Sequence, residues 1–183
     1  RRIIDNLKKI VAYLLSTAFS EIVVIGGALV IGGPLPLLPS QILWTNIIEE
    51  GFMNFAFAFE PKEPGIMRRS PRESASRTVV TPEIRRLVAV VTVVTGVLLF
   101  ALYLLFVRLD LPEAKLRTLM FVALAIDSIF FSFSLKNLHA PLWTIPLLSN
   151  RYLLGALGIS LMMLFVAIFV PPIAEAANVP ASI

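Results

Sequence analysis

Long tracts without a charged residue constrain this chain more than any other feature. Residues 87–107 and 153–170 contain no Asp, Glu, Lys or Arg. A helix of about 20 apolar residues is long enough to cross the hydrocarbon core of a bilayer. Only 15% of the chain is charged and 57% is hydrophobic, whereas a soluble domain is about a quarter charged. The sequence therefore predicts a membrane protein and excludes a soluble enzyme fold.

Five apolar tracts predict an all-α polytopic membrane protein, a transmembrane helix bundle of about five spans. The predicted spans are residues 10–32, 37–59, 87–107, 118–135 and 153–170. A transmembrane β-barrel is excluded because these tracts are apolar on both alternating faces. The segment Gly32-Gly33-Pro34-Leu35-Pro36 cannot continue a helix. It predicts a tight hairpin, with the first two spans as antiparallel neighbours.

The distribution of basic residues predicts the orientation. If the N-terminus is cytoplasmic, every Lys and Arg except Arg108, Lys115 and Arg117 lies on the cytoplasmic side. This bias is typical of the positive-inside rule. We expect an integral membrane protein, in the plasma membrane of a prokaryote, with its N-terminus in the cytoplasm. The net charge of +4 is explained by loops that face anionic lipid, so no nucleic-acid partner is predicted.

The available side-chain chemistry is narrow. The chain has no cysteine and one histidine, His139. Disulfides, thiolate nucleophiles and sites built from Cys or several His residues are therefore excluded. Any binding chemistry must use carboxylates, amides and hydroxyls.

Four carboxylates interrupt the apolar spans at a common depth. They are Glu21 in the first span, Glu49 and Glu50 in the second, and Asp127 in the fourth. An ionised side chain at the bilayer centre costs about 2.5–3.5 kcal/mol even on insertion scales. No Lys or Arg lies at this depth. We therefore expect the four acids to face one another across the bundle and to bind a cation or protons.

The second span has the most detailed pattern. Asn46, Glu49 and Glu50 follow a spacing of i, i+3 and i+4, which places them on one helix face, and Asn54 lies four residues further on. Gly51 is expected to let the backbone unwind and to free carbonyl oxygens. Such an oxygen-only ligand set suits calcium, sodium or magnesium. In the alternative interpretation, each acid is protonated and hydrogen-bonded to a neighbouring helix.

Motifs in the second span and the loop after it resemble a known family. Gln41-Ile42-Leu43-Trp44, then Asn46-Ile47-Ile48-Glu49-Glu50 and later Arg68-Arg69-Ser70-Pro71-Arg72, resemble the sixth transmembrane helix and following loop of P-type cation-transporting ATPases of the calcium-pump group. Residues 1–21 resemble the stalk and fifth helix of that family. Ala125-Ile126-Asp127 resembles the eighth helix. The resemblance covers essentially the whole chain, as helices five to nine.

The resemblance implies a set of cation ligands. The residues that match ligand positions of the family are Glu21, Asn46, Glu50 and Asp127, with Glu49 where the family often has Thr. Two departures matter. Ala18 replaces a ligating amide and Glu49 replaces a neutral hydroxyl, so a two-calcium site is not implied. One hypothesis is a single divalent ion, with Glu49 carrying protons in counter-transport.

The resemblance also implies a division of the chain. It comprises a cytoplasmic stalk end (1–9), a helical hairpin with the cation site (10–59), a cytoplasmic coupling loop (60–86), three further helices (87–170) and an extracytoplasmic tail (171–183). The phosphorylated Asp-Lys-Thr-Gly motif of the family is not in these residues. We therefore expect a fragment, a truncated gene or one part of a longer pump.

The implied partners follow from this division. ATP and magnesium would act only through phosphorylation, nucleotide-binding and actuator domains that lie outside this chain, as do the first four helices. The lipid bilayer and the transported cation complete the set. Calcium is favoured as the ion, ahead of manganese, sodium and protons. Two other functions stay open: a secondary proton/cation antiporter using the same carboxylates, and a non-transporting membrane assembly subunit.

Overall fold

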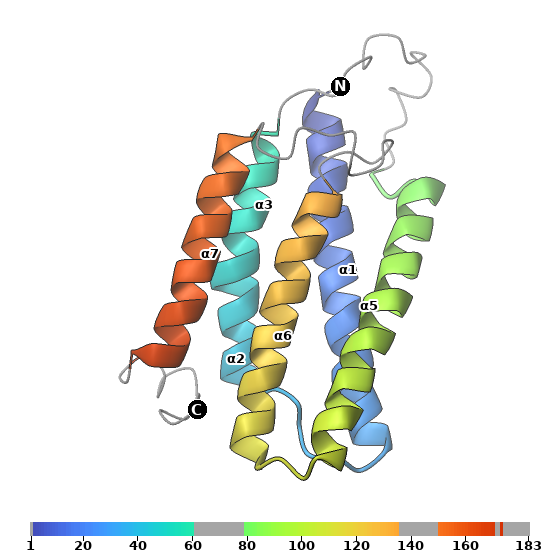
Figure 1. The fold of residues 1–183 in the computed structure, drawn as a ribbon. Helices are drawn as coiled ribbons and strands as arrows, with labels where there is room; N and C mark the ends of the chain where they lie inside the picture. The colour runs from blue at the N-terminus through green and yellow to red at the C-terminus, as the bar shows by residue number, and fades with distance from the viewer. Residues whose placement is uncertain (1, 61–78, 136–149, 171–172, 174–183) are drawn as a thin grey trace.

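The computed structural model describes residues 2–60, 79–135, 150–170 and 173, without the side chains of Arg2, Ile48 and Glu49. Within these residues the secondary structure is helical (Figure 1). The elements are α1 (Arg2–Val30), α2 (Pro39–Trp44), the π-helix η1 (Thr45–Glu49), α3 (Glu50–Ala58), α5 (Pro82–Arg108), α6 (Glu113–Ser134) and α7 (Arg151–Phe169). The predicted all-α polytopic bundle is confirmed.

Four helices are long and apolar enough to cross a membrane. They are Ile3–Val30 within α1, then Pro82–Arg108, Glu113–Ser134 and Arg151–Phe169. The remaining predicted span, residues 37–59, is built from α2, η1 and α3 in direct succession. Residues 2–9, the predicted stalk, belong to the same helix as the first span. Most of the predicted loop 60–86 and nearly all of the tail 171–183 lie outside the described residues.

The predicted hairpin follows α1. Gly32 adopts a φ of +66°, which glycine tolerates because it has no Cβ. The N–H of Gly33 returns to the carbonyl of Ala28 at 3.0 Å, so the end of α1 is capped. α2 then begins with Pro39, where the missing N–H is not needed. The hairpin therefore places α1 antiparallel to α2, η1 and α3 (Figure 1).

The helices cross the bundle in alternating directions (Figure 1). α1 and α5 therefore run parallel, and this pair makes the most extensive helix contact of the fold. Two glycines allow the close approach. A Cβ on Gly96 would lie 3.0 Å from Val23, and a Cβ on Gly27 would lie 2.5 Å from the ring of Phe100. On the other side, α3 packs against α1 and α7.

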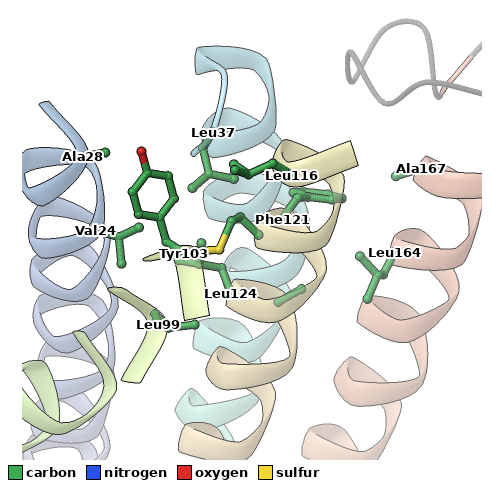
Figure 2. Packing of buried hydrophobic residues seen from close by; sticks show 12 residues of the cluster. Val24, Ala28, Leu37, Leu99, Tyr103, Leu116, Phe121, Leu124, Leu164 and Ala167 are labelled. Carbon is green, nitrogen blue, oxygen red and sulfur yellow. The ribbon is translucent and has the colours of Figure 1, made fainter. Parts of the chain in front are cut away.

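The buried side chains form two apolar clusters at opposite ends of the bundle. The hairpin-end cluster, seen in Figure 2, joins α1, α5, α6 and α7 to the segment before α2. The N-terminal-end cluster joins α1, α3, α5, α6 and α7 near the start of α1. Tyr13 stacks on Phe131 there, with ring centroids 6.0 Å apart. Between the clusters lies a band of polar side chains.

Candidate functional site

The polar band, called the polar layer below, crosses every long helix at middle depth. Its members carry hydroxyl, amide or carboxylate groups. They are Ser16, Thr17, Ser20, Glu21, Thr45, Asn46, Glu50, Thr92, Thr95, Asp127, Ser128 and Ser160. Glu21 and Glu50 are buried, and Asp127 is partly buried. The layer therefore contains three of the four predicted acids, and the side chain of the fourth, Glu49, lies outside the description.

Two hydrogen-bonded pairs join α1 to the helical stretch that follows the hairpin. The hydroxyl of Thr17 donates to Oε2 of Glu50 at 3.1 Å. One turn further along α1, the side chain of Glu21 is hydrogen-bonded to the side chain of Asn46, whose amide N–H is the donor to a carboxylate. Thr17 and Glu21 are four residues apart, as are Asn46 and Glu50. The two pairs form successive rungs between antiparallel helices.

The π-helix η1 sets the register of these rungs. The N–H of Glu50 reaches back five residues to the carbonyl of Thr45, so the turn holds one more residue than an α-turn. Single π-turns within α-helices are frequent at functional sites. The expected unwinding at Gly51 is wrong, because Gly51 lies inside α3. The departure from α-helical geometry instead lies in residues 45–49, directly before Glu50. The π-turn accommodates one extra residue there, and the chain continues directly into α3.

Asp127 belongs to neither rung. It lies on α6 next to Ser128, whose hydroxyl donates to the carbonyl of Ala125 at 3.1 Å. Among the described residues, no group of three His, Cys, Asp or Glu side chains is close enough to hold a metal ion. The structure thus joins Glu21 with Asn46 and Glu50 with Thr17. It does not bring Asp127 into a metal cluster with the other two described acids.

The sequence analysis did not single out the hydroxyl residues of α1. Ser16, Thr17 and Ser20 all lie within the two turns that precede Glu21. Ser20 and Thr95 are hydrogen-bonded at 2.6 Å across α1 and α5. Hydroxyls within one or two turns of a buried acid in an apolar span were the signal that could have identified them. Together with the carboxylates and the amide, they make an oxygen-rich layer suited to a hard cation.

Comparison with known proteins places this chain in a family. The family model "Cation transporting ATPase, C-terminus" matches residues 34–181. The chain is 34% identical over 165 residues to the "Probable cation-transporting ATPase F" of Mycobacterium tuberculosis, covering 87% of this chain and 17% of that protein. It is 28% identical over 195 residues to the "Calcium-transporting ATPase 1" of Bacillus cereus, covering 99% of this chain and 22% of that protein.

A third relative gives a similar picture. Identity to the "Calcium-transporting ATPase" of Bacillus subtilis is 27% over 173 residues, covering 94% of this chain and 19% of that protein. The chain spans about a fifth of the length of these curated relatives. With its membrane-spanning helices and a family match over most of its length, the chain belongs to the cation-transporting P-type ATPases, of which it is a C-terminal transmembrane portion.

Proposed function

We propose that this chain is the membrane transport part of an ATP-driven calcium pump. In this proposal Glu21, Asn46, Glu49, Glu50 and Asp127 bind the cation at middle depth during alternating access. The observation that carries the proposal is the pair of rungs between α1 and η1–α3, Thr17 with Glu50 and Asn46 with Glu21. They hold two carboxylates from two separate helices at adjacent levels of the bundle.

The chemistry of these contacts supports cation binding. Thr17 and Asn46 are neutral, so their hydrogen bonds orient the carboxylates without neutralising them. A buried carboxylate is costly unless its charge is compensated. A bound divalent cation supplies that compensation, and oxygen ligands favour calcium or magnesium. Calcium is preferred because two of the relatives carry it in their names.

The remaining parts of the proposal concern coupling. ATP and magnesium act on domains outside this chain, and those domains tilt α1 through residues 2–9. Because α1 carries both Thr17 and Glu21, its movement changes the geometry of both rungs. The cation then exchanges between tight and loose coordination. The N-terminus is cytoplasmic, the membrane is the plasma membrane of a prokaryote, and the loop 60–86 contacts the phosphorylation domain.

The test is transport by the complete protein that contains this chain, in inside-out vesicles. ATP should drive uptake of radioactive calcium. Glu21→Gln and Glu50→Gln should each lower the apparent calcium affinity at least about tenfold, which corresponds to about 1.4 kcal/mol. Glu113→Gln is the matched control, because this carboxylate is exposed and paired with Arg117 at 2.6 Å. Its calcium affinity should equal that of the wild type.

Three results would contradict the proposal or a part of it. Calcium uptake that follows a proton gradient and ignores ATP would support a secondary antiporter. Absence of any ATP hydrolysis stimulated by calcium, manganese, magnesium or sodium would reject a cation pump. Equal affinity of wild type, Glu21→Gln and Glu50→Gln would remove these carboxylates from the site.

A further inference from the structure

A buried asparagine at the start of α7 uses its whole hydrogen-bonding capacity. Oδ1 of Asn150 accepts the N–H groups of Tyr152 at 2.9 Å and of Leu153 at 3.1 Å. Nδ2 donates to the carbonyl of Ala56 at 3.3 Å and to the carboxylate of Glu60. A side-chain amide has two donor hydrogens and two acceptor lone pairs, and all four are engaged. Asn150 therefore caps α7 and at the same time holds the end of α3.

The end of α3 is held from two sides. The last carbonyls of a helix lack partners within the helix. Asn150 supplies a donor to Ala56, while Nδ2 of Asn6 on α1 donates to the carbonyls of Ala58 at 3.0 Å and Glu60 at 3.1 Å. Asn6, Glu60 and Asn150 are all at most 5% exposed. These contacts fix where α3 ends relative to both neighbouring helices.

α3 links this anchor directly to the proposed cation site. Ala56 lies six residues beyond Glu50 in one uninterrupted α-helix, a distance of about 9 Å along the axis. α7 contacts η1 as well as α3. The ring centroids of Phe59 and Tyr152 lie 4.8 Å apart. A displacement of the end of α3 against α7 would therefore move Glu50.

We infer that Asn150 is a positioning residue that fixes the end of α3, and with it Glu50, relative to α7. The inference rests on the proposed cation transport. Glu60 is the partner through which Asn150 acts. In this arrangement the Asn150–Glu60 contact determines how well Glu50 is placed for the ion.

Substitutions can separate the two tasks of Asn150. Asn150→Asp and Asn150→Ser keep an oxygen that caps α7 but remove the side-chain amide whose two N–H groups donate to Ala56 and Glu60. In the complete protein, each should lower the apparent calcium affinity about tenfold and leave the maximal rate of ATP hydrolysis within about twofold. Asn150→Asp also places two carboxylates in contact. Adding Glu60→Gln returns a donor, so the double variant should recover affinity to within about threefold of the wild type.

A crosslink tests whether α3 and α7 move together. The chain has no cysteine, so Phe59→Cys with Tyr152→Cys introduces a unique pair within it. Bridging the pair with a short bis-methanethiosulfonate, a thiol crosslinker that reduction removes, should leave at least half of the calcium-stimulated ATP hydrolysis. The two single variants, treated in the same way, are the controls. Loss of activity on bridging, recovered on reduction, would overturn the inference.

The remaining outcomes separate this inference from the proposed function. Unchanged calcium affinity in folded Asn150→Asp and Asn150→Ser, or failure of Glu60→Gln to rescue Asn150→Asp, would overturn the positioning role. If the wild type shows no cation-stimulated ATP hydrolysis, the proposed function fails. The contact is then tested by thermal unfolding in detergent, where Asn150→Asp should lower Tm by about 3 °C and the double variant should restore it. Additive effects of the two substitutions would reject the contact itself.

Discussion

The hairpin-end cluster and the polar layer are built from the same helices but have opposite chemistry. In the cluster, side chains of α1, α5, α6 and α7 are apolar except for Tyr103 (Figure 2). The hydroxyl of Tyr103 donates to the carbonyl of Pro34 at 2.8 Å, at the edge of the hairpin. In the polar layer, buried oxygens remain without partners among the described residues, as at Ser16 and Thr92.

This difference separates the tasks of packing and binding. Apolar side chains gain little by leaving lipid, so close contact and shape hold the cluster together. Polar groups in the interior of the bundle cost free energy to insert into the membrane, and they would pack no better than Leu. A layer that breaks the apolar pattern on several helices at one depth is where function is expected to override stability. Substitutions in the two regions should therefore have different consequences.

The largest effect on stability is expected in the hairpin-end cluster. Phe121 is fully buried there, and Phe121→Ala should lower the free energy of unfolding by about 3 kcal/mol. This is the low end of the range for Phe→Ala, since lipid and not water is the alternative environment. Unfolding by a denaturing detergent measures the change. The folded fraction should bind calcium with unchanged affinity.

The control for this substitution lies on the same helix. Phe130 is 70% exposed, so Phe130→Ala should change the free energy of unfolding by less than about 0.5 kcal/mol. Equal losses for Phe121→Ala and Phe130→Ala would mean that the cluster is not the packed region described here. A changed calcium affinity in Phe121→Ala would mean that packing and binding are not separated.

The fold was largely predictable from sequence because its determinants are local. The length of an apolar tract determines whether it can form a span. The segment from Gly32 to Pro36 terminates the first span whatever the position of the other helices. The depth of Glu21 and Glu50 follows from counting residues along a span. The partners of these acids do not follow, because they depend on how two helices are rotated and shifted against each other. Thr17 and Asn150 were missed for this reason.

The π-turn shows the limit most clearly. Spacing of i, i+3 and i+4 assumes 3.6 residues per turn, and that assumption fails across residues 45–49. Gly51 has a low helix propensity, yet it lies inside α3, a helix that packs against both α1 and α7. Local propensity placed the irregularity one turn too late. The site geometry depends on this turn, since it precedes Glu50 directly.

A smaller effect on stability is expected in the polar layer, at Thr17. Thr17→Val keeps the shape but removes the donor to Glu50, and should lower the free energy of unfolding by about 1.5 kcal/mol, near the upper limit for a hydrogen bond within a membrane. Unlike Phe121→Ala, it should also lower calcium affinity. Thr17→Ser keeps the hydroxyl and serves as the control. Loss of calcium affinity in Thr17→Ser equal to that in Thr17→Val would show that the hydroxyl is not the cause.

The smallest effect tests whether hydroxyls of the polar layer differ among themselves. The hydroxyls of Ser20 and Thr95 form a 2.6 Å hydrogen bond in which either can donate, and Oγ1 of Thr95 also lies 3.0 Å from the carbonyl oxygen of Val91. Ser20→Ala should lower the free energy of unfolding by about 0.6 kcal/mol, the average for such bonds in membranes, because Thr95 keeps the carbonyl of Val91 as an acceptor.

Thr92→Val is the matched comparison for Ser20→Ala. Its Oγ1 is buried and has no partner among the described residues, so removing it should leave the free energy of unfolding unchanged or raise it. The order Thr17→Val, Ser20→Ala, Thr92→Val then ranks the hydroxyls by partner: a carboxylate, a neutral oxygen and none. A loss at Ser20→Ala greater than that at Thr17→Val would show that contact with α5, and not with the acids, dominates this layer.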